Sequence, residues 1–437
     1  MTSPTTRLMH LGVNCTEYGR HSGGWLHPDS DVSQMPNIDV YRHIARKAEQ
    51  GCMDQLFVAD TPVHKRGQLS VGPTRMDPIQ VALLMAHETE HIGVVATMTT
   101  SYNDPYDLAR RAASLATLTG GRAGINFVAN SGDDVARNFN LPGQLSHDER
   151  FERYEEFLEV VTRLWAGAAD GDHDAVPVRH SGRYFEVDAA LDTRRPPLGR
   201  PLVVMAGSSE QSRDQAARWA DAVYAAGRQL EGAQEFYADL KERAAAYGRD
   251  PDSLRIMLGI TSFIGDTVEE AEELERTLDT LHARGSDTIG YLSGVLELDL
   301  SVFDPDGPLP FDELPQVRSS SVSQSELLTR MARELGLSIR ELAFRAYAGG
   351  LFNMQFREAL TPLQLADTMQ EWFEAGTCDG FTVVAPIVPR TIDDFVDKVV
   401  PILQERGLVR TSYDDGPTTH AGLLGLQELD PRVPATA

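Results

Sequence analysis

Two serine residues occupy a position at which a phosphate group is readily held. Ser208 and Ser209 follow Gly207 at the end of the apolar run 202–206, and they precede a helical segment over 210–220. Backbone N–H groups, two hydroxyl groups and the positive end of a helix dipole then converge on one point. The pattern predicts a phosphate cradle, although the same residues fit an ordinary helix N-cap equally well.

A second helix start carries a histidine. Ser146, with Glu149 three residues on, forms a capping-box pattern, and apolar residues recur at helical spacing from Tyr154 to Trp165. His147 lies in the first turn of this helix, where the helix dipole favours an anion. Two helix starts of this kind predict one phosphorylated ligand.

Polar side chains stand at the C-terminal ends of several apolar runs. In a parallel α/β barrel these ends line the mouth, where ligands bind. Each side chain taken alone also fits a second role, which is to satisfy loop backbone. The residues concerned are Asn14, Asp60, Thr97, Thr99, Asn126 and Asn130.

The segment from His87 to His91 matches the His-Glu-x-x-His pattern of zinc peptidases, with Glu88 as the base. It closes a helix and leads directly into the apolar run 92–98. It therefore lies at the N-terminal end of a strand. In barrel enzymes the residues at this end contribute to stability, whereas the active site lies at the opposite end. No third ligand is evident, so we expect no metal site. Stoichiometric zinc and inhibition by chelators would indicate the peptidase instead.

Eight short apolar runs alternate with amphipathic segments along the chain, as is typical of repeated β-α units around a parallel sheet. A helix over 105–118, which opens at Asp104 and stops at Gly120, is one of the connecting segments. Eight strands with interleaved helices favour a closed TIM (β/α)8 barrel. The runs span residues 9–14, 54–59, 92–98, 123–129, 202–206, 222–226, 255–264 and 380–386.

Three stretches exceed a minimal barrel, namely residues 130–149, 170–200 and 285–355. We expect them to be insertions over the C-terminal face of a single domain spanning 1–437. The last contains a loop rich in Asp, Pro and Ser over 299–324, followed by a helical segment over 325–347. This last stretch is interpreted either as a lid over the active site or as a surface loop without a function.

Composition excludes several classes of protein. The chain has 437 residues, and 40 Lys and Arg against 65 Asp and Glu give a net charge of -25. Such a charge repels phosphate backbones and anionic lipid, so no nucleic-acid or membrane partner is expected. Three scattered cysteines form no disulfide framework, and no run approaches the ~20 apolar residues of a membrane span. These features favour a cytoplasmic protein.

Longer motifs resemble a known family. They match, in order and over nearly the whole chain, the nitrilotriacetate and dibenzothiophene-sulfone monooxygenase family of bacterial luciferase-like flavin monooxygenases. The motifs include HSGGWLHPD (21–29), AEQGCMDQLFVAD (48–60), IGVVATMTTSYNDPYDLARRAASLATLTGGRAGINFVAN (92–130), HDERFERYEEFLEVVTRLW (147–165), HSGRYFEVDAALDTRRPPLGRPLVVMAGSS (180–209) and LTPLQLADTMQEWFEAGTCDGFTVVAP (360–386). The superfamily fold is a TIM barrel, in agreement with the strand count.

The resemblance implies where the cofactor FMN binds. Phe151 stands where relatives carry a tyrosine that hydrogen-bonds the phosphate, so one such contact is missing. His21, in the loop after the first strand, is the catalytic candidate, because it is placed to bond a flavin peroxide or the substrate. Cys15 and Trp25 are candidate walls of the substrate pocket. The resemblance assigns Asp60, Thr97, Asn126 and Asn130 to the ring and ribityl region and His147, Ser208 and Ser209 to the ribityl and phosphate end.

The resemblance also implies a reaction. Members of this family take reduced FMN from a separate NAD(P)H:flavin reductase, react it with O2 and oxygenate a small organic substrate through a flavin C4a-peroxide. The cofactor supplies the oxygen chemistry, and the protein excludes water. A homodimer is expected from the family alone. The alternatives are a deazaflavin (F420)-dependent oxidoreductase on the same barrel and a non-catalytic flavin-binding protein.

Overall fold

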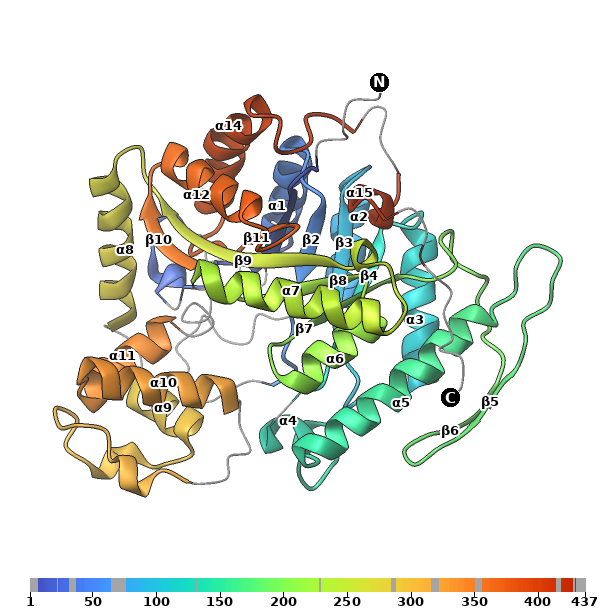
Figure 1. Cartoon of the computed structure of the whole chain (residues 1–437), viewed down its shortest axis with the longest axis horizontal. Helices are drawn as coiled ribbons and strands as arrows, with labels where there is room; N and C mark the ends of the chain where they lie inside the picture. Colours follow the sequence, from blue (N-terminus) through green and yellow to red (C-terminus); the bar gives the residue numbers. More distant parts are fainter. Residues whose placement is uncertain are drawn as a thin grey trace.

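The computed structural model describes residues 7–21, 23–30, 37–63, 76–130, 132–227, 229–283, 288–315, 322–349, 356–413, 418–426 and 429. Its centre is a closed barrel of parallel strands surrounded by helices (Figure 1). The barrel strands are β1 (His10–Cys15), β2 (Gln55–Val58), β3 (Gly93–Thr99), β4 (Ala123–Val128), β7 (Leu202–Ala206), β8 (Ala222–Ala225), β9 (Arg255–Ile264) and β11 (Gly380–Val383).

The strands pair in the order β9-β11-β1-β2-β3-β4-β7-β8, and pairing of β8 with β9 closes the ring. Each of the eight predicted apolar runs corresponds to one of these strands, with β1 and β3 ending one residue beyond their runs, so the predicted TIM barrel is confirmed. The bounds differ most at the last run, because β11 ends at Val383. In the register of β3 and β4, Thr97 lies opposite Asn126.

Helices cover the outside of the barrel in the expected alternation. Their starts carry the predicted caps: the Asp104 carboxylate accepts from the N–H groups of Tyr106 and Asp107, and Ser146 and Glu149 form both bonds of a capping box. The covering helices are α1 (Ile38–Gln50), α2 (Pro78–His87), α3 (Pro105–Leu118), α5 (His147–Ala166), α6 (Glu210–Trp219), α7 (Leu230–Ala246), α12 (Pro362–Glu374), and α13 (Arg390–Asp394) continued by a π-helical turn (Phe395–Val399) and α14 (Val400–Glu405).

Side chains alternate across each strand between two apolar layers. Leu11 and Val13 of β1 belong to the large cluster between strands and helices, and so does Cys15. Phe57 and Val95 belong to a separate cluster inside the barrel. Because successive residues of a strand point to opposite faces, Asn14 faces the interior at the C-terminal end of β1.

Most elements outside the minimal barrel were not predicted from the sequence, although the helical segment predicted over 325–347 is present as α10 (Val322–Leu335) and α11 (Ile339–Gly349). A hairpin projects from the barrel (Figure 1), and β10 adds a parallel strand beside the far end of β9. A helical unit with its own apolar core follows α8. These elements are α4 (Asp133–Asn138), β5 (Val178–Ser181), β6 (Glu186–Ala189), α8 (Val268–Ala283), α9 (Thr288–Leu296), α10 (Val322–Leu335), α11 (Ile339–Gly349) and β10 (Phe356–Leu360).

The segment expected to be an irregular loop over 299–324 is only partly irregular. It contains two short 3-10 turns, at Leu300–Val302 and Phe311–Glu313, and the start of α10. Residues 316–321 of this segment lie outside the described part. Leu300 and Leu309 are buried in the same apolar core as α9 to α11, so this segment packs as part of the helical unit.

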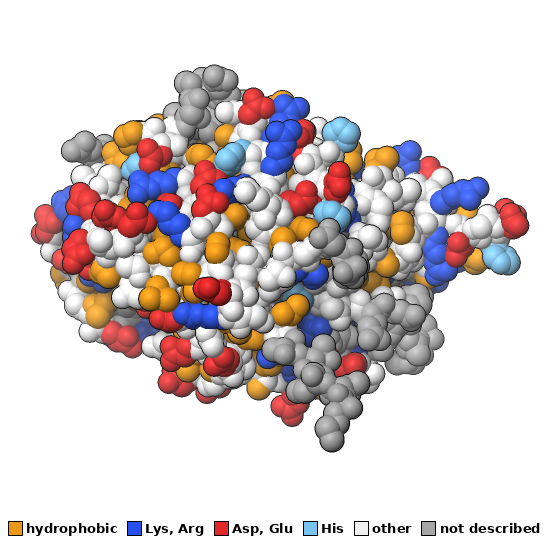
Figure 2. Space-filling view, turned by 90° about the horizontal axis from the view of Figure 1, so that it is seen from above, with side chains coloured by type: hydrophobic (Ala, Val, Ile, Leu, Met, Phe, Trp, Pro, Cys, Tyr) orange, Lys and Arg blue, Asp and Glu red, His pale blue; other side chains and the backbone are white. Residues whose placement is uncertain are grey.

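The charged surface agrees with the composition. Figure 2 shows acidic and basic side chains interspersed over one face, with acidic groups crowded at the end where Figure 1 places α8. That helix carries consecutive acidic pairs, including Glu269 with Glu270 and Glu272 with Glu273. Among the described residues, no helix is long and apolar enough to cross a membrane.

Candidate active site

The C-terminal ends of the barrel strands gather polar side chains inside the mouth. Thr97 and Asn126 are almost fully buried, and the Asn126 amide donates to the Thr97 hydroxyl at 3.0 Å. Asn14 is equally buried at the end of β1. The predicted grouping of these three strand ends follows from the barrel geometry, because parallel strands end on one face.

Several buried polar atoms at this mouth have no hydrogen-bond partner among the described residues. They include the side-chain oxygens of Asn14, Asn126 and Asn130 and the indole N–H of Trp25. Buried polar groups in native proteins are almost always paired, so such a cluster marks where a ligand completes the bonding. A flavin ring system offers N–H and carbonyl groups along its edge, and amide side chains fit both kinds of group.

The turn from Gly207 to Ser209 begins helix α6. Ser209 caps α6, and its hydroxyl accepts from the Ser212 N–H at 3.2 Å. Gly207 has a φ of +130°, and a Cβ atom there would lie 2.7 Å from the Ser212 hydroxyl, so only glycine fits this turn. Ser208 is exposed. The N-cap is therefore confirmed, and the phosphate cradle stays a prediction for the same turn.

The starts of α5 and α6 lie on the same side of the barrel. The two helices contact each other where Glu155 accepts from Gln215 at 3.3 Å and also pairs with Arg218. His147 precedes Glu155 by about two helical turns, and Ser209 precedes Gln215 by nearly as much. Both helix N-termini therefore lie at a similar distance beyond the α5–α6 contact, on the side of the barrel mouth.

His147 itself is exposed, and Phe151 lies against it with the ring centroids 4.8 Å apart. The imidazole also lies 3.5 Å from the Asp148 carboxylate. Phe151 is half-buried between His147 and Tyr154, and it brings no hydroxyl group to this end of the site. The chain therefore lacks the phenol that the family resemblance places here.

His21 is fully buried, and both ring nitrogens are engaged within the protein. The Gly23 N–H donates to Nδ1 at 3.0 Å, which leaves the proton on Nε2, and Nε2 donates to the Asp279 carboxylate at 3.0 Å. Asp279 belongs to α8, so the bond joins the loop after β1 to that helix. We expected His21 to contact the peroxide or the substrate directly. In this geometry both of its ring nitrogens are already bonded within the protein.

Cys15 also differs from its expected place. Its side chain lies in the apolar layer between strands and helices, because it shares the outward face of β1 with Leu11 and Val13. Burial raises the pKa of its thiol well above the usual range. Asn14, rather than Cys15, occupies the inward position of β1. Trp25 lies half-buried in the 3-10 turn η1 (Gly24–Leu26), which packs against α8.

The segment from His87 to His91, which matches the zinc pattern, is engaged in other contacts in the structure. Helix α2 ends at His87, Glu88 pairs with Arg42 and Arg46, and His91 stacks on Tyr413. Within the described ranges, no group of His, Cys, Asp and Glu side chains is arranged to hold a metal ion.

Comparison with known proteins identifies the family. A model of luciferase-like monooxygenases matches residues 19–288. The chain is 38% identical over 432 residues to N-acetyl-S-(2-succino)cysteine monooxygenase of Bacillus subtilis, covering 95% of this chain and 96% of that protein. The chain belongs to the luciferase-like monooxygenase family.

Other members of the luciferase-like monooxygenase family agree with this assignment. Component A of nitrilotriacetate monooxygenase from Aminobacter aminovorans is 36% identical, over 93% of this chain and 94% of that protein. The solved structure of EDTA monooxygenase from Chelativorans superposes with a TM-score of 0.76 at 31% identity, over 96% of this chain and 99% of the other. The predicted class, a flavin-dependent monooxygenase on a TIM barrel, is thereby confirmed.

Proposed function

We propose that this protein binds reduced FMN at the C-terminal mouth of its barrel and uses O2 to oxygenate a small organic substrate. The observation that carries the proposal is the set of buried, unpartnered amide oxygens on Asn14, Asn126 and Asn130. Bound reduced flavin activates O2, of which one atom enters the substrate and the other leaves as water.

We assign the two ends of the flavin to two groups of residues. Asp60, which follows β2, joins Thr97, Asn126 and Asn130 around the ring and ribityl chain. The phosphate belongs at the start of α5 and α6, where His147, Ser208 and Ser209 offer N–H and hydroxyl donors. Phe151 contributes an aromatic face to this end.

Exclusion of water is the protein's second task. Trp25 and the η1 turn lie beside the mouth, and His21 fixes this loop to α8 through Asp279. Helix α11 contacts α8, so the unit of α9 to α11 adjoins the same side of the barrel. We propose that the chain is a single TIM-barrel domain in which this unit covers the site as a lid.

The partner that fits this function is a separate NAD(P)H:flavin reductase. The nitrilotriacetate relative is designated component A, which indicates an oxygenase that works with a second component. We also propose a homodimer in the cytoplasm, where its three free cysteines would stay reduced. The three relatives named above act on N-acetyl-S-(2-succino)cysteine, nitrilotriacetate and EDTA, so carboxylated amines and thioethers are the first substrates to test.

The test is anaerobic titration of the purified protein with reduced FMN, followed by rapid mixing with oxygenated buffer. We expect saturable binding and a return to the oxidised flavin spectrum that is clearly slower than for free reduced FMN. Absence of binding, or a return as fast as in free solution, would contradict the proposal. Binding of reduced deazaflavin with hydride transfer would favour the F420 alternative. Peroxide release that no organic compound alters would favour a non-catalytic flavin protein.

A further inference from the structure

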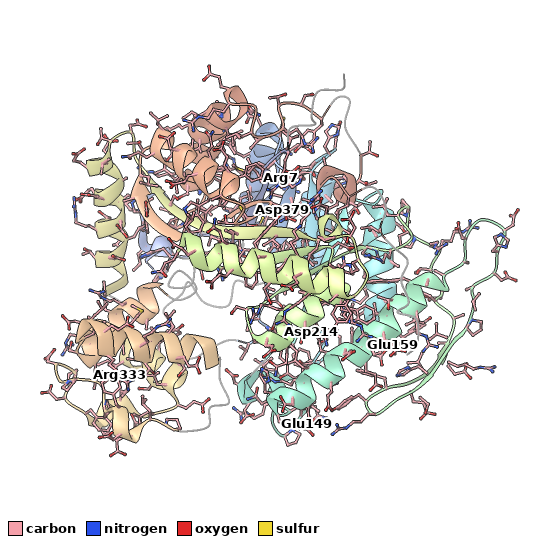
Figure 3. All side chains as sticks on the ribbon, viewed as in Figure 1. Arg7, Glu149, Glu159, Asp214, Arg333 and Asp379 are labelled. Carbon is pink, nitrogen blue, oxygen red and sulfur yellow. The ribbon has the colours of Figure 1, made fainter. Side chains whose placement is uncertain are left out.

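Arg150 is a buried cation that has no carboxylate partner in the part of the chain that the structure describes. It lies in the first turns of α5, next to Glu149, which Figure 3 labels near the start of that helix. The residue is 9% exposed, and the one hydrogen bond of its guanidinium within the described chain runs from Nη1 to the Asn130 carbonyl at 3.2 Å. The buried Nε has no partner. A guanidinium group has five N–H donors, so most of them are uncommitted.

Two further unpartnered groups lie beside this guanidinium. The Tyr102 hydroxyl and the Asn130 side-chain oxygen are both buried without a hydrogen-bond partner. The neighbouring Ser101 hydroxyl lies 3.4 Å from the same Asn130 carbonyl that Arg150 reaches, so the loops after β3 and β4 meet at this point. Stacking on Phe139, with centroids 4.8 Å apart, fixes the Tyr102 ring.

The nearby acidic residues do not neutralise Arg150. Asp133 accepts from the Gln144 N–H at 2.9 Å, and Asp134 accepts from the Val135 N–H at 2.9 Å. Neither carboxylate forms an ion pair with Arg150. Burial lowers the pKa of the guanidinium, but the group stays charged. A buried charge without a counterion is costly, so this site favours an anionic ligand.

Arg153, one turn further along α5, shows what a structural arginine looks like in the same helix. It donates to the carbonyls of Thr100 and Asn103, and its guanidinium lies 4.5 Å from the centre of the Phe185 ring. Its contacts are with backbone and an aromatic face that are already in place. Arg150 differs because its inner nitrogen and the adjacent phenol both lack partners.

We propose that Arg150 and Tyr102 bind an oxyanion of the ligand at the barrel mouth. The planar guanidinium fits a carboxylate or a phosphate with two parallel hydrogen bonds, and the phenol donates a third. The oxyanion comes from one of two sources, the phosphate group of the flavin or a carboxylate group of the organic substrate. This inference rests on the proposed function, because it places the anion in the flavin and substrate site.

The experiment compares FMN with riboflavin, which lacks the phosphate group, in the wild type and in Arg150→Gln. Dissociation constants are measured by flavin fluorescence, and binding of nitrilotriacetate is measured on the flavin-loaded protein. If the flavin supplies the oxyanion, the preference for FMN over riboflavin falls roughly ten- to hundred-fold in the variant. If a substrate supplies it, that preference is unchanged and nitrilotriacetate binding weakens by a similar factor.

Two further variants separate binding from folding. Arg153→Gln should lower the melting temperature while leaving the preference for FMN and the binding of nitrilotriacetate unchanged. Arg150→Lys keeps the charge and should recover part of the lost affinity, and it replaces the glutamine variant if that protein does not fold. The oxyanion site is overturned if neither the FMN preference nor nitrilotriacetate binding depends on Arg150. Failure of the wild-type protein to bind either FMN or riboflavin would instead count against the proposed flavin site.

Discussion

The His21 imidazole acts, in this geometry, through the residue it holds rather than through the reacting atoms. Its Nε2–H donates to Asp279, and its ring lies edge-on to Phe263 with centroids 6.0 Å apart. His21→Ala removes the tie between the loop after β1 and α8. We expect reoxidation of bound reduced flavin to quicken roughly ten-fold, since water reaches the site, while flavin affinity changes little. Stopped-flow absorbance after mixing with O2 measures this rate.

Asp279→Asn provides the matched control for that experiment, because it weakens the same bond from the other side. If His21 is a positioning residue, both variants quicken reoxidation and raise the share of O2 released as peroxide. A large effect of His21→Ala beside a silent Asp279→Asn would show that the imidazole contacts the reacting groups directly. Normal coupled turnover in His21→Ala would remove either role.

The sequence predicted which residues of the site lie at the C-terminal ends of strands, because the direction of each strand determines the face of the barrel at which it ends. Asn14, Thr97 and Asn126 end apolar runs, and parallel strands bring such ends together. The placement of Cys15 was not predictable in the same way, because a shift of one residue moves a side chain to the other face. The Arg150 cluster also escaped notice, since an arginine in an amphipathic helix gives no sign that it is buried without a partner.

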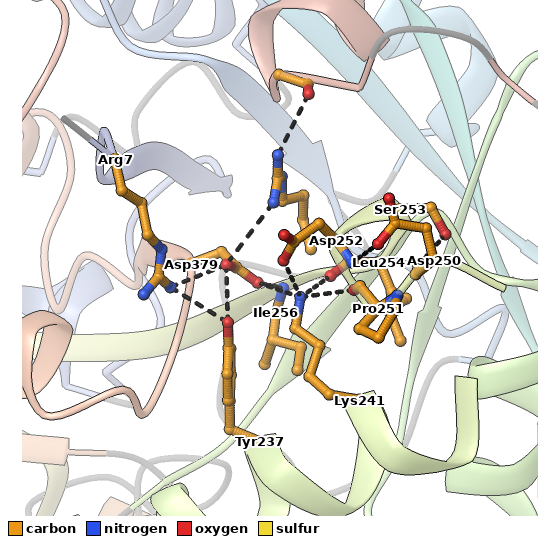
Figure 4. A network of polar contacts seen from close by, with 12 residues as sticks. Arg7, Tyr237, Lys241, Asp250, Pro251, Asp252, Ser253, Leu254, Ile256 and Asp379 are labelled. Carbon is orange, nitrogen blue, oxygen red and sulfur yellow. Dashed lines mark hydrogen bonds and ion pairs between the residues drawn. The ribbon is translucent and has the colours of Figure 1, made fainter. Parts of the chain in front are cut away.

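At the scale of elements, one buried carboxylate links a helix and two strands at the N-terminal end of the barrel (Figure 4). Asp379 lies 2.9 Å from Arg7 and 3.4 Å from Lys241, and it accepts from the Tyr237 hydroxyl and the Ile256 N–H. Burial raises its pKa, but Lys241, the Ile256 N–H and the neighbouring arginines outweigh burial and hold the pKa below its usual value.

Asp379→Asn should therefore destabilise the protein strongly. The substitution leaves the buried Lys241 ammonium with the carbonyls of Pro251 and Leu254 but without its buried carboxylate, and breaking such an ion pair costs about 3–5 kcal/mol. The free energy of unfolding from urea titration measures the loss. Asp252→Asn removes an exposed carboxylate 3.9 Å from the same ammonium, and it should cost less than about 1 kcal/mol. Equal losses in the two variants would contradict the importance of the buried contact.

The elements that sequence predicted and those it missed differ in how they are buried. Barrel strands such as β3 and β9 are covered on both faces, so they read as continuous apolar runs. The hairpin of β5 and β6 alternates between half-buried and exposed residues, and β10 pairs with β9 beyond the barrel, so neither gives that signal. The helical segment over 325–347 was predicted, but the separate apolar core that it forms with α9 was not, because a loop rich in Pro and Asp lies between them in the sequence.

Over the whole molecule, the far end of the chain completes the barrel that the first strands begin. The short helix α15 (His420–Leu423) reaches the barrel floor, where Leu424 packs with Phe57 and Val95. Gly93 leaves room for it, because a Cβ atom there would lie 2.4 Å from the His420 ring. Arg255 donates to the Leu424 carbonyl at 2.7 Å and fixes the segment.

The imidazole of His420 in this segment makes the free energy of unfolding depend on pH. His420 is fully buried, and its Nε2 lies 3.2 Å from the Gln55 side-chain oxygen. Burial lowers its pKa to about 4, against the opposing influence of Asp54 and Asp221. In the unfolded chain the imidazole titrates near its ordinary value of about 6.5. Between about pH 6.5 and pH 4 the imidazole is protonated in the unfolded chain but neutral in the folded protein. The free energy of unfolding therefore decreases as the pH is lowered through this range.

The stabilisation that His420 contributes should be fully present above about pH 6.5 and decline by about 3 kcal/mol as the pH falls to 4. Urea titrations at several pH values measure the decline in the wild type. His420→Gln keeps a hydrogen-bonding side chain but cannot titrate. It should lower the free energy of unfolding at pH 7 and flatten the slope between pH 6.5 and 4. Parallel pH profiles of the two proteins would show that the barrel floor does not set the acid limit of the fold.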